Sequence, residues 1–279
     1  MLTPAERQLA LDRAMVPEHL PEYGASVSRA EPFLLEGCLC WSAGAELVVA
    51  GYPLEPGPGL AGVLDAANGR FKPQRLDLLA PALPRWSRPL EEVARDSYWR
   101  IDPSRPRPNK KLRNLLRRAR RACRLEAGGS MGTEHEALVR AFCRKRSLGR
   151  DQEQLLARLP DYLAAAAGSW LVSARDQSGQ LSGFGIFDFS ARDWAFHLFH
   201  FRDPGLSGLG AADVLLEAGL AEAAGRGFRQ MNLGLGISPG VSFFKSKWGG
   251  EPFLPFVHGR ALLVRPSLWR ALLGGTGFF

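Results

Sequence analysis

A glycine-rich loop in front of a long apolar helix is the first segment of this sequence whose residues could bind a ligand. Glycine lets the backbone approach a ligand closely, and a helix start offers unpaired N–H groups with a partial positive charge. Such a loop can hold an anion such as a diphosphate, although a plain strand-to-helix connection has the same composition. The candidate cofactor-binding residues are Gly205, Ser207, Gly208, Leu209, Gly210 and Ala211.

Two histidines precede that loop, in a segment (residues 194–202) that is predicted to form a strand. His197 and His200 are three positions apart, so a regular strand would point them to opposite faces and prevent them from sharing a metal ion. Either one, or Asp188 or Asp193, could accept a proton from an attacking amine. A packed histidine without a chemical role is the alternative.

The positive charge of the chain is concentrated in one segment. The formal net charge is +8, and ten basic residues with no acid among them lie between Arg105 and Arg124; without them 26 basic and 28 acidic residues remain, a net of −2. The segment could bind nucleic-acid phosphates or anionic lipid headgroups, or form a solvated helix paired with acids elsewhere. It lacks interleaved aromatic residues, so we expect any RNA contact to be to the backbone. The candidate anion-binding residues are Lys110, Lys111, Arg113, Arg117, Arg118 and Arg121.

Composition sets the class of protein. With 46% hydrophobic and 23% charged residues the chain is typical of a globular protein, and it contains no run of 18 apolar residues and no basic-then-apolar leader. We therefore expect a cytoplasmic protein. The four cysteines form no CxxC pair and no metal-ligand spacing, so we expect them to be buried as small hydrophobic residues.

The elements that must position these groups form a recognisable order. Leu112, Leu115, Leu116 and Ala119 recur at helical spacing, which makes the basic segment an amphipathic helix. Two further helices follow (residues 133–146 and 152–166), and Pro160 should kink or split the second. Then come three antiparallel strands, the glycine-rich loop, a helix (211–224), a strand (228–233), a short helix (241–248) and a last strand (253–264).

The first hundred residues give a fainter version of the same order. Residues 33–54 are predicted to form two short strands, and a Gly57-x-Gly59 turn, a short helix (60–67) and a strand (75–79) follow. We therefore predict an internal duplication with a reduced first copy. The predicted parts are an N-terminal half (residues 1–104), a basic connecting helix (105–127) and a C-terminal half with the reaction centre (128–279).

Two stretches of the C-terminal part resemble the GNAT superfamily. The segment from Gly205 to Leu216 looks like the GNAT loop and helix that bind the diphosphate of acyl-CoA. The closing stretch, with the strand at Met231–Leu233 and the Phe243–Gly250 segment FFKSKWGG, is similar to the end of tandem-GNAT FemAB-like proteins. That grouping includes DUF2156 proteins and the soluble half of lysyl-phosphatidylglycerol synthases. The LRNLLRRARR helix also resembles theirs, and the resemblance covers about residues 97–260.

The resemblance implies a fold and a chemistry. The fold would be α/β (α+β): two GNAT-like halves, each a mixed, mostly antiparallel sheet flanked by helices. In FemAB-like transferases the Phe-Lys pair lies beside the ester of an aminoacyl-tRNA, so Phe244 would contact the donor and Lys245 would lie near its carbonyl. A fixed ammonium there would stabilise the negative charge that aminolysis builds on the carbonyl oxygen. The alternative is that Lys245 and Lys247 form a solvated helix face.

We therefore expect an acyltransferase that moves an aminoacyl group from aminoacyl-tRNA, or an acyl group from acyl-CoA, to an amine acceptor between the halves. No cofactor is expected to be tightly bound, acyl-CoA would act as a co-substrate, and no metal is expected. The competing hypothesis is a non-catalytic module that binds RNA or an anionic membrane surface through the arginine-rich helix.

Overall fold

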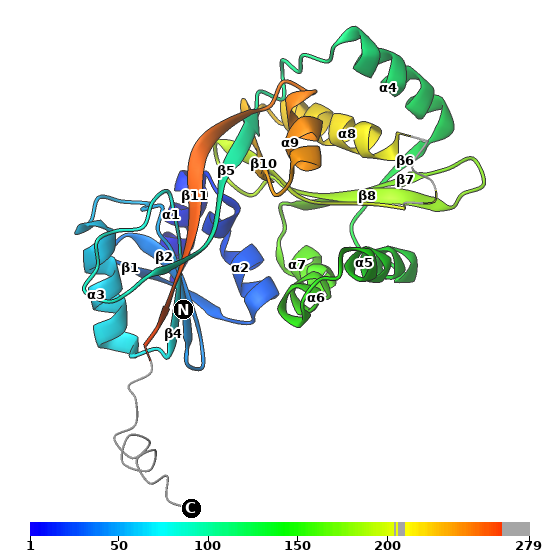
Figure 1. Cartoon of the computed structure of the whole chain (residues 1–279). Helices are drawn as coiled ribbons and strands as arrows, with labels where there is room; N and C mark the ends of the chain where they lie inside the picture. Colours follow the sequence, from blue (N-terminus) through cyan, green and yellow to red (C-terminus); the bar gives the residue numbers. More distant parts are fainter. Residues whose placement is uncertain (204, 206–209, 264–279) are drawn as a thin grey trace, which may run out of the picture.

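One sheet runs through the whole molecule. The computed structural model describes residues 1–203, 205 and 210–263, and Figure 1 shows the chain. Within these residues eleven strands form a continuous sheet in the order β1-β2-β3-β4-β11-β5-β10-β9-β8-β7-β6.

The N-terminal part supplies three helical segments before its first strand. Its elements are α1 (Pro4–Arg13), the 3-10 turn η1 (Pro17–His19), α2 (Pro21–Ser28), β1 (Glu31–Leu35), β2 (Cys38–Ala43), β3 (Glu46–Ala50), α3 (Gly59–Phe71), β4 (Arg75–Ala80) and β5 (Glu91–Ile101). The stretch 33–54, predicted to contain two strands, belongs to three. Glu36 and Gly37 both have positive φ (48° and 78°), so the chain reverses there in a tight turn that the sequence prediction missed.

The C-terminal part follows the predicted order closely. Its elements are α4 (Lys110–Ala122), β6 (Arg124–Gly128), α5 (Thr133–Arg146), α6 (Arg150–Leu156), α7 (Leu159–Ala165), β7 (Ser169–Arg175), β8 (Leu181–Asp188), β9 (Trp194–Arg202), α8 (Ala211–Gly225), β10 (Gln230–Leu235), α9 (Pro239–Ser246) and β11 (Glu251–Leu262). The helix containing Pro160 is split, as predicted, because proline is accommodated in the first turn of α7.

Both parts repeat one topology. Three antiparallel strands are followed by a helix and then by a strand parallel to the third: β1-β2-β3, α3, β4 in the first part and β7-β8-β9, α8, β10 in the second. Strands β5 and β11 pair with each other between the two parts, where β11 also pairs with β4 and β5 with β10. Figure 1 shows both as long strands that pass from one part to the other.

Helices cover both faces of the C-terminal sheet. Helix α8 packs on β7, β8 and β9 from one side, with α4 against its outer surface, and α5 and α7 lie on the other side (Figure 1). Phe187 and Val214 belong to the core under α8, whereas Phe184 and Phe201 belong to the core against α5 and α7. The four cysteines are all buried, as predicted.

Helix α4 confirms the amphipathic interpretation of the basic segment. Asn109 accepts the backbone N–H of Leu112 at 2.9 Å and caps the helix, and Leu112, Leu116 and Ala119 are buried. The helix is shorter than the predicted segment 105–127. It ends at Ala122, because Cys123 already has extended backbone angles and Arg124 begins strand β6.

Candidate functional site

Lys245 is a buried lysine on the short helix α9. Lys245 is only 5% exposed, and its Nζ donates a hydrogen bond to the carbonyl oxygen of Leu235 at 2.5 Å. Burial lowers the pKa of Lys245 from its usual 10.5 to about 7, although the nearby Asp96 carboxylate opposes the shift. The solvated-helix alternative is therefore wrong for Lys245.

The lysine lies where two parallel strands part. Strands β9 and β10 pair only from Gln230↔Trp194 to Asn232↔Phe196, although β9 continues to Arg202. Gly234 of β10 has φ +76°, and a Cβ there would come within 3.8 Å of the His197 carbonyl oxygen and 3.9 Å of Lys245 Nζ. Glycine thus allows β10 to turn away from β9, and the lysine ammonium lies beside the separation.

A β-bulge brings His197 and His200 together. Strand β8 pairs Phe187 with His197 but Ile186 with Phe199, so Leu198 is an extra residue in β9. Because of this extra residue the two histidines share a face, and Nδ1 of His200 lies 3.2 Å from Nε2 of His197. The prediction of opposite faces assumed a regular strand and is wrong.

The histidine pair is a neutral, partly unsatisfied group. Burial, together with the charges of Arg202 and Lys247, lowers the pKa of His200 to about 4, and burial also lowers the pKa of His197 well below its usual value. Nε2 of His200 is buried and has no hydrogen-bond partner among the described residues. Leaving such an atom unpaired costs about 1–3 kcal/mol, which a substrate group could recover.

Phe244 lies between the histidine pair and Lys247. Its ring centroid is 5.8 Å from that of His200, and the Lys247 Nζ lies 4.7 Å from the Phe244 centroid. The half-buried ring also packs on the core beneath α8. The structure therefore groups Phe244, Lys245, His197 and His200, which come from two elements far apart in the sequence.

Asp96 is a site residue that sequence analysis missed. Its carboxylate accepts the backbone N–H of Ile237 at 2.6 Å and that of Ser97 at 2.7 Å. Ile237 has φ +58°, a costly conformation for a β-branched residue, and its side chain is 79% exposed. Asp96 thus holds the strained turn that leads into α9. It is 141 residues from Ile237 along the chain, and no local motif marks it.

The start of α8 already carries an anion. Asp213, in the first turn, is 4% exposed; its carboxylate accepts Lys247 Nζ at 2.7 Å and Trp248 Nε1 at 3.0 Å. Gly210 precedes the helix with φ +70°, and a Cβ there would lie 2.9 Å from the Ala119 Cβ of α4. The predicted residues Ser207, Gly208 and Leu209 lie outside the described residues. Gly205 donates its N–H to Asp203 at 2.7 Å, and Ala211 begins α8.

Solved structures share this architecture. A conserved protein of unknown function from Bacteroides thetaiotaomicron matches with TM-score 0.65 and 13% identity, covering 93% of this chain and 97% of its own. FemX matches with TM-score 0.63 and 9% identity over 98% of both chains. The DUF2156 domain of a putative lysylphosphatidylglycerol synthetase from Agrobacterium fabrum matches with TM-score 0.59 and 14% identity over 91% and 90%.

The chain has the GNAT-type fold of FemX and DUF2156 domains. The predicted fold class, a mixed and mostly antiparallel sheet flanked by helices, is confirmed. No protein-family model matches the sequence, and no curated protein matches it significantly. These identities are far too low to carry a reaction over, so the likeness establishes the fold alone.

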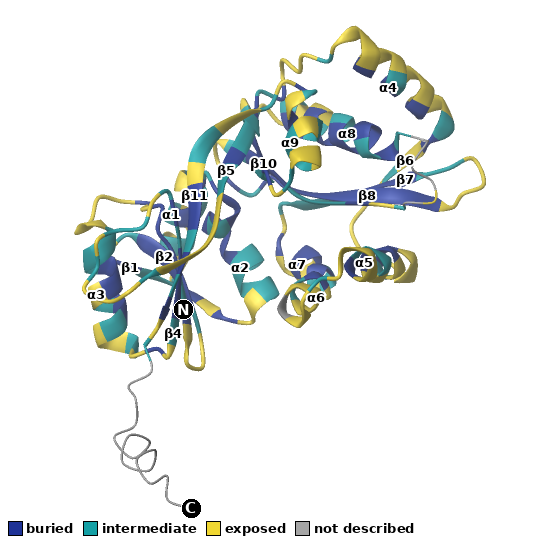
Figure 2. Cartoon of the chain, viewed as in Figure 1, coloured by how far each residue is buried: buried dark blue, intermediate teal, exposed yellow. Residues whose placement is uncertain are grey.

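In this GNAT-type fold the basic surface belongs to α4. The candidate residues Lys110, Lys111, Arg113, Arg117, Arg118 and Arg121 are all exposed. Arg120 forms an ion pair with Glu217 of α8, whereas none of those six has an acidic partner in the described part of the chain. Figure 2 shows the outer surface of α4 as exposed and the surface toward α8 as buried.

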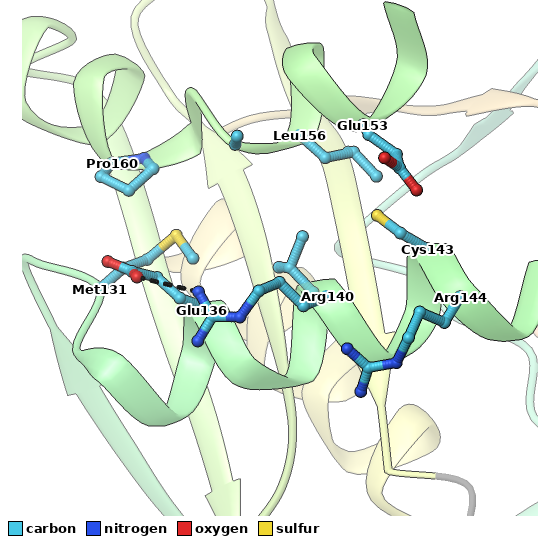
Figure 3. A pocket seen from close by; sticks show the side chains of 10 residues that line it. Met131, Glu136, Arg140, Cys143, Arg144, Glu153, Leu156 and Pro160 are labelled. Atoms are coloured by element: carbon cyan, nitrogen blue, oxygen red, sulfur yellow. Dashed lines mark hydrogen bonds and ion pairs between the residues drawn. The ribbon is translucent and has the colours of Figure 1, made fainter. Parts of the chain in front are cut away.

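One cavity lies away from these residues. This cavity, of about 390 Å³, lies between α5 and the α6–α7 segment, on the sheet face opposite α8. Figure 3 shows Met131 and Leu156 among its lining, and Arg140 pairs there with Glu136. None of the predicted site residues lines it.

No helix among the described residues is both long and apolar enough to cross a bilayer. No group of three or more His, Cys, Asp or Glu side chains in the described ranges could hold a metal ion.

Proposed function

We propose that the protein transfers an aminoacyl group from aminoacyl-tRNA to an amine acceptor. The observation that carries this proposal is the buried Lys245 ammonium beside the separation of β9 and β10. A desolvated cation has little reason to be buried unless it stabilises charge, and a dry site makes that stabilisation strong. The GNAT-type fold shared with FemX and a lysylphosphatidylglycerol synthetase domain supports an acyl-transfer reaction.

The proposed step is an aminolysis. The neutral amine nitrogen attacks the ester carbonyl carbon, and the carbonyl oxygen takes up negative charge that the Lys245 ammonium stabilises. The C–O bond to the ribose then breaks, the amide bond remains, and the amine proton ends on the departing ribose hydroxyl. We infer that Nε2 of His200, which has no hydrogen-bond partner among the described residues, hydrogen-bonds in this transfer, while the low pKa of His200 keeps the imidazole neutral. Holding amine and ester together supplies much of the remaining acceleration.

The charges around α8 favour tRNA as the donor. The helix start that would receive a diphosphate already has a buried carboxylate, Asp213, in its first turn, where Lys247 pairs with it. Close by, α4 offers six exposed basic side chains that have no acidic partner among the described residues, and these suit the repeated phosphates of an RNA backbone.

Acyl-CoA is the second candidate donor, and a specific observation favours it. The sequence from Gly205 to Gly210, directly before α8, contains three glycines, whose amide groups could receive a diphosphate. A tandem GNAT protein from the clavulanic acid biosynthesis pathway, whose structure was solved without AcCoA, has a similar fold (TM-score 0.52, 13% identity).

The test compares donors directly. Purified protein is titrated with an aminoacyl-tRNA pool, deacylated tRNA, acetyl-CoA and anionic vesicles at two salt concentrations. We expect preference for charged tRNA, weakened steeply by salt. Arg117→Glu with Arg121→Glu should reduce this binding, whereas Lys110→Gln alone should weaken it much less.

Transfer of radiolabelled amino acid to an amine pool then separates enzyme from binding module. Lys245→Ala should abolish transfer while tRNA binding is kept. If acetyl-CoA binds tightly in a salt-tolerant way, the donor assignment is wrong. If only vesicles or RNA bind, and Lys245→Ala changes no activity, the protein is a binding module.

A further inference from the structure

The cavity between α5 and the α6–α7 segment has an apolar floor. Val139, Cys143 and Leu156 line it, and all three are buried members of the core that these helices share with β8 and β9. Burial raises the pKa of the Cys143 thiol, so the thiol stays protonated and behaves as a small apolar group. Met131 and Pro160 add further apolar surface. Covering this floor with an apolar group of a ligand removes apolar surface from water, which is favourable.

Opposite charges lie on the two walls of this cavity. Arg144 comes from α5 and Glu153 from α6, and both are exposed residues that line it. Neither side chain forms an ion pair with any described residue, so the two are not in contact with each other. Figure 3 shows Arg144 on one helix and Glu153 on the other, with the cavity between the helices. A single ligand can therefore meet both a cation and an anion.

A second arginine lies one helical turn before Arg144. Arg140 pairs with Glu136 of the same helix, but the N–O distance is 3.4 Å and the two side chains are 60% and 45% exposed. Such an exposed pair is weak, so Arg140 can turn to a ligand with little loss. Because Arg140 and Arg144 are four residues apart, they lie on the same side of α5. Guanidinium groups match the geometry of a carboxylate, so this wall suits a carboxylate.

The three features together match a free amino acid with an apolar side chain. Its carboxylate suits the two arginines, its ammonium group suits Glu153, and its side chain suits the floor. The cavity volume of about 390 Å³ lies within the range of about 300–1,000 Å³ that small-molecule sites have. A fatty acid would leave the Glu153 carboxylate unpaired against its chain, and a diphosphate would bring like charge to Glu153 and cover none of the floor.

We propose that this cavity binds a free α-amino acid with an apolar side chain, such as leucine. Arg140 and Arg144 hold its carboxylate, and Glu153 holds its ammonium group. The bound ligand covers these exposed charges from water, which strengthens their attraction. The site goes beyond the proposed function, because it lies on the sheet face opposite α8, whereas Phe244, next to Lys245, packs on the core beneath α8.

Isothermal titration calorimetry of the full chain tests each contact of the ligand. L-Leucine is compared with L-leucinamide, which lacks the carboxylate, and with 4-methylpentanoate, which lacks the ammonium group. We expect saturable binding of leucine, and binding at least about tenfold weaker for each of the other two, because each loses a charge-assisted hydrogen bond. Glycine lacks the apolar side chain and should also bind at least about tenfold more weakly.

Variants assign the binding to this cavity. Glu153→Gln, and Arg140→Gln combined with Arg144→Gln, should each weaken leucine binding at least about tenfold. Asp161→Asn and Lys145→Gln are the matched controls, since both residues are exposed on the same helical segments but do not line the cavity, and they should leave binding unchanged. All five substituted side chains are exposed, so we expect unchanged melting temperatures.

A cavity-filling variant gives an independent test. Ala157, at the end of α6, is exposed and lines the cavity, so Ala157→Phe occupies the space without removing a charge and should abolish leucine binding. Unchanged binding by this variant or by Glu153→Gln, equal binding of leucine and leucinamide, or no saturable binding by wild type overturns the amino-acid site. Lys245→Ala should keep leucine binding, so a chain that binds leucine but transfers nothing refutes the proposed function alone.

Discussion

The two parts of the sheet repeat one topology but differ at one strand pair. In the N-terminal part β3 and β4 pair from Glu46↔Arg75 to Ala50↔Leu79, and the Gly51 N–H still donates to the Leu79 carbonyl at 2.7 Å beyond the strand end. In the C-terminal part β9 and β10 pair over three positions and then part. The β3–β4 pair, called the closed pair here because its hydrogen bonds continue to the strand ends, lies over an apolar core. The β9–β10 pair, called the open pair because its strands separate, is bordered by Lys245 and two histidines.

This difference indicates how a repeated fold can carry one reaction centre. Backbone hydrogen bonds that continue along a strand pair leave no polar group free for a ligand. Where the bonds stop, the freed carbonyl of Leu235 can fix an ammonium, and side chains can occupy the separation. The C-terminal part thus lacks part of the backbone hydrogen-bond ladder between β9 and β10, whereas the N-terminal part keeps the equivalent ladder between β3 and β4.

The largest expected effect comes from removing the cation of the open pair. Lys245→Ala should lower kcat by about 10²–10³-fold, because the oxyanion loses its buried charge. Thermal unfolding should be little affected, since the variant also removes the desolvation penalty of that charge. Lys72→Ala, which removes an exposed lysine of the N-terminal part, is the control and should leave kcat unchanged. An equal effect of both variants would break the comparison.

The histidine pair should have the next largest effect. His200→Phe keeps a ring against Phe244 but removes the unpaired nitrogen, and we expect kcat to fall about 10–100-fold. His258→Phe, which removes the Asp77 partner in the N-terminal part, should alter stability but not kcat. Steady-state kinetics at saturating donor measures both; unchanged kcat in His200→Phe would exclude a role in proton transfer.

The pH profile should sharpen the role of Lys245. Its neighbours are Asp96 on β5, which favours the ammonium, and His197 on β9, which stays neutral. Because the pKa is lowered to about 7, kcat should decline as pH rises through about 7 and the ammonium loses its proton. Lys245→Arg should move this limb to much higher pH.

Stability has the opposite trend with pH. The folded chain binds fewer protons at Lys245 than the unfolded chain between about pH 7 and 10.5, so the free energy of unfolding rises with pH there. In Lys245→Met the free energy of unfolding should not rise with pH in this range. Denaturant titrations at several pH values would measure it. A wild-type curve as flat as that of the variant would contradict the lowered pKa.

The smallest effect on activity should come from the closed pair. Leu78 on β4 is fully buried, and Leu78→Ala should cost about 2–5 kcal/mol of unfolding free energy through the cavity it leaves. We expect kcat per folded molecule to stay within about twofold. Leu233→Ala on β10, equally buried but beside the separation, should lower both stability and kcat. Denaturant unfolding and active-fraction kinetics distinguish the two.

Patterns within single elements were predictable from the sequence, and relations between elements were not. The leucine spacing of α4, the proline split before α7 and the elements around Lys245 were all confirmed, because hydrophobic period and turn residues act over short distances. The bulge at Leu198 was not foreseen, because it depends on how β8 registers against β9. Asp96 carries no local signal, since only the folded sheet brings it to Ile237.

Strand β11 links the order of synthesis to the order of folding. Residues 251–262 complete the N-terminal sheet by pairing with β4, as in Leu262↔Arg75, so that sheet keeps an open edge until nearly the whole described chain has left the ribosome. The hairpins β7-β8-β9 need only local contacts and can form earlier. The part made first is therefore finished last, and a chain stalled before residue 251 should expose β4 to aggregation.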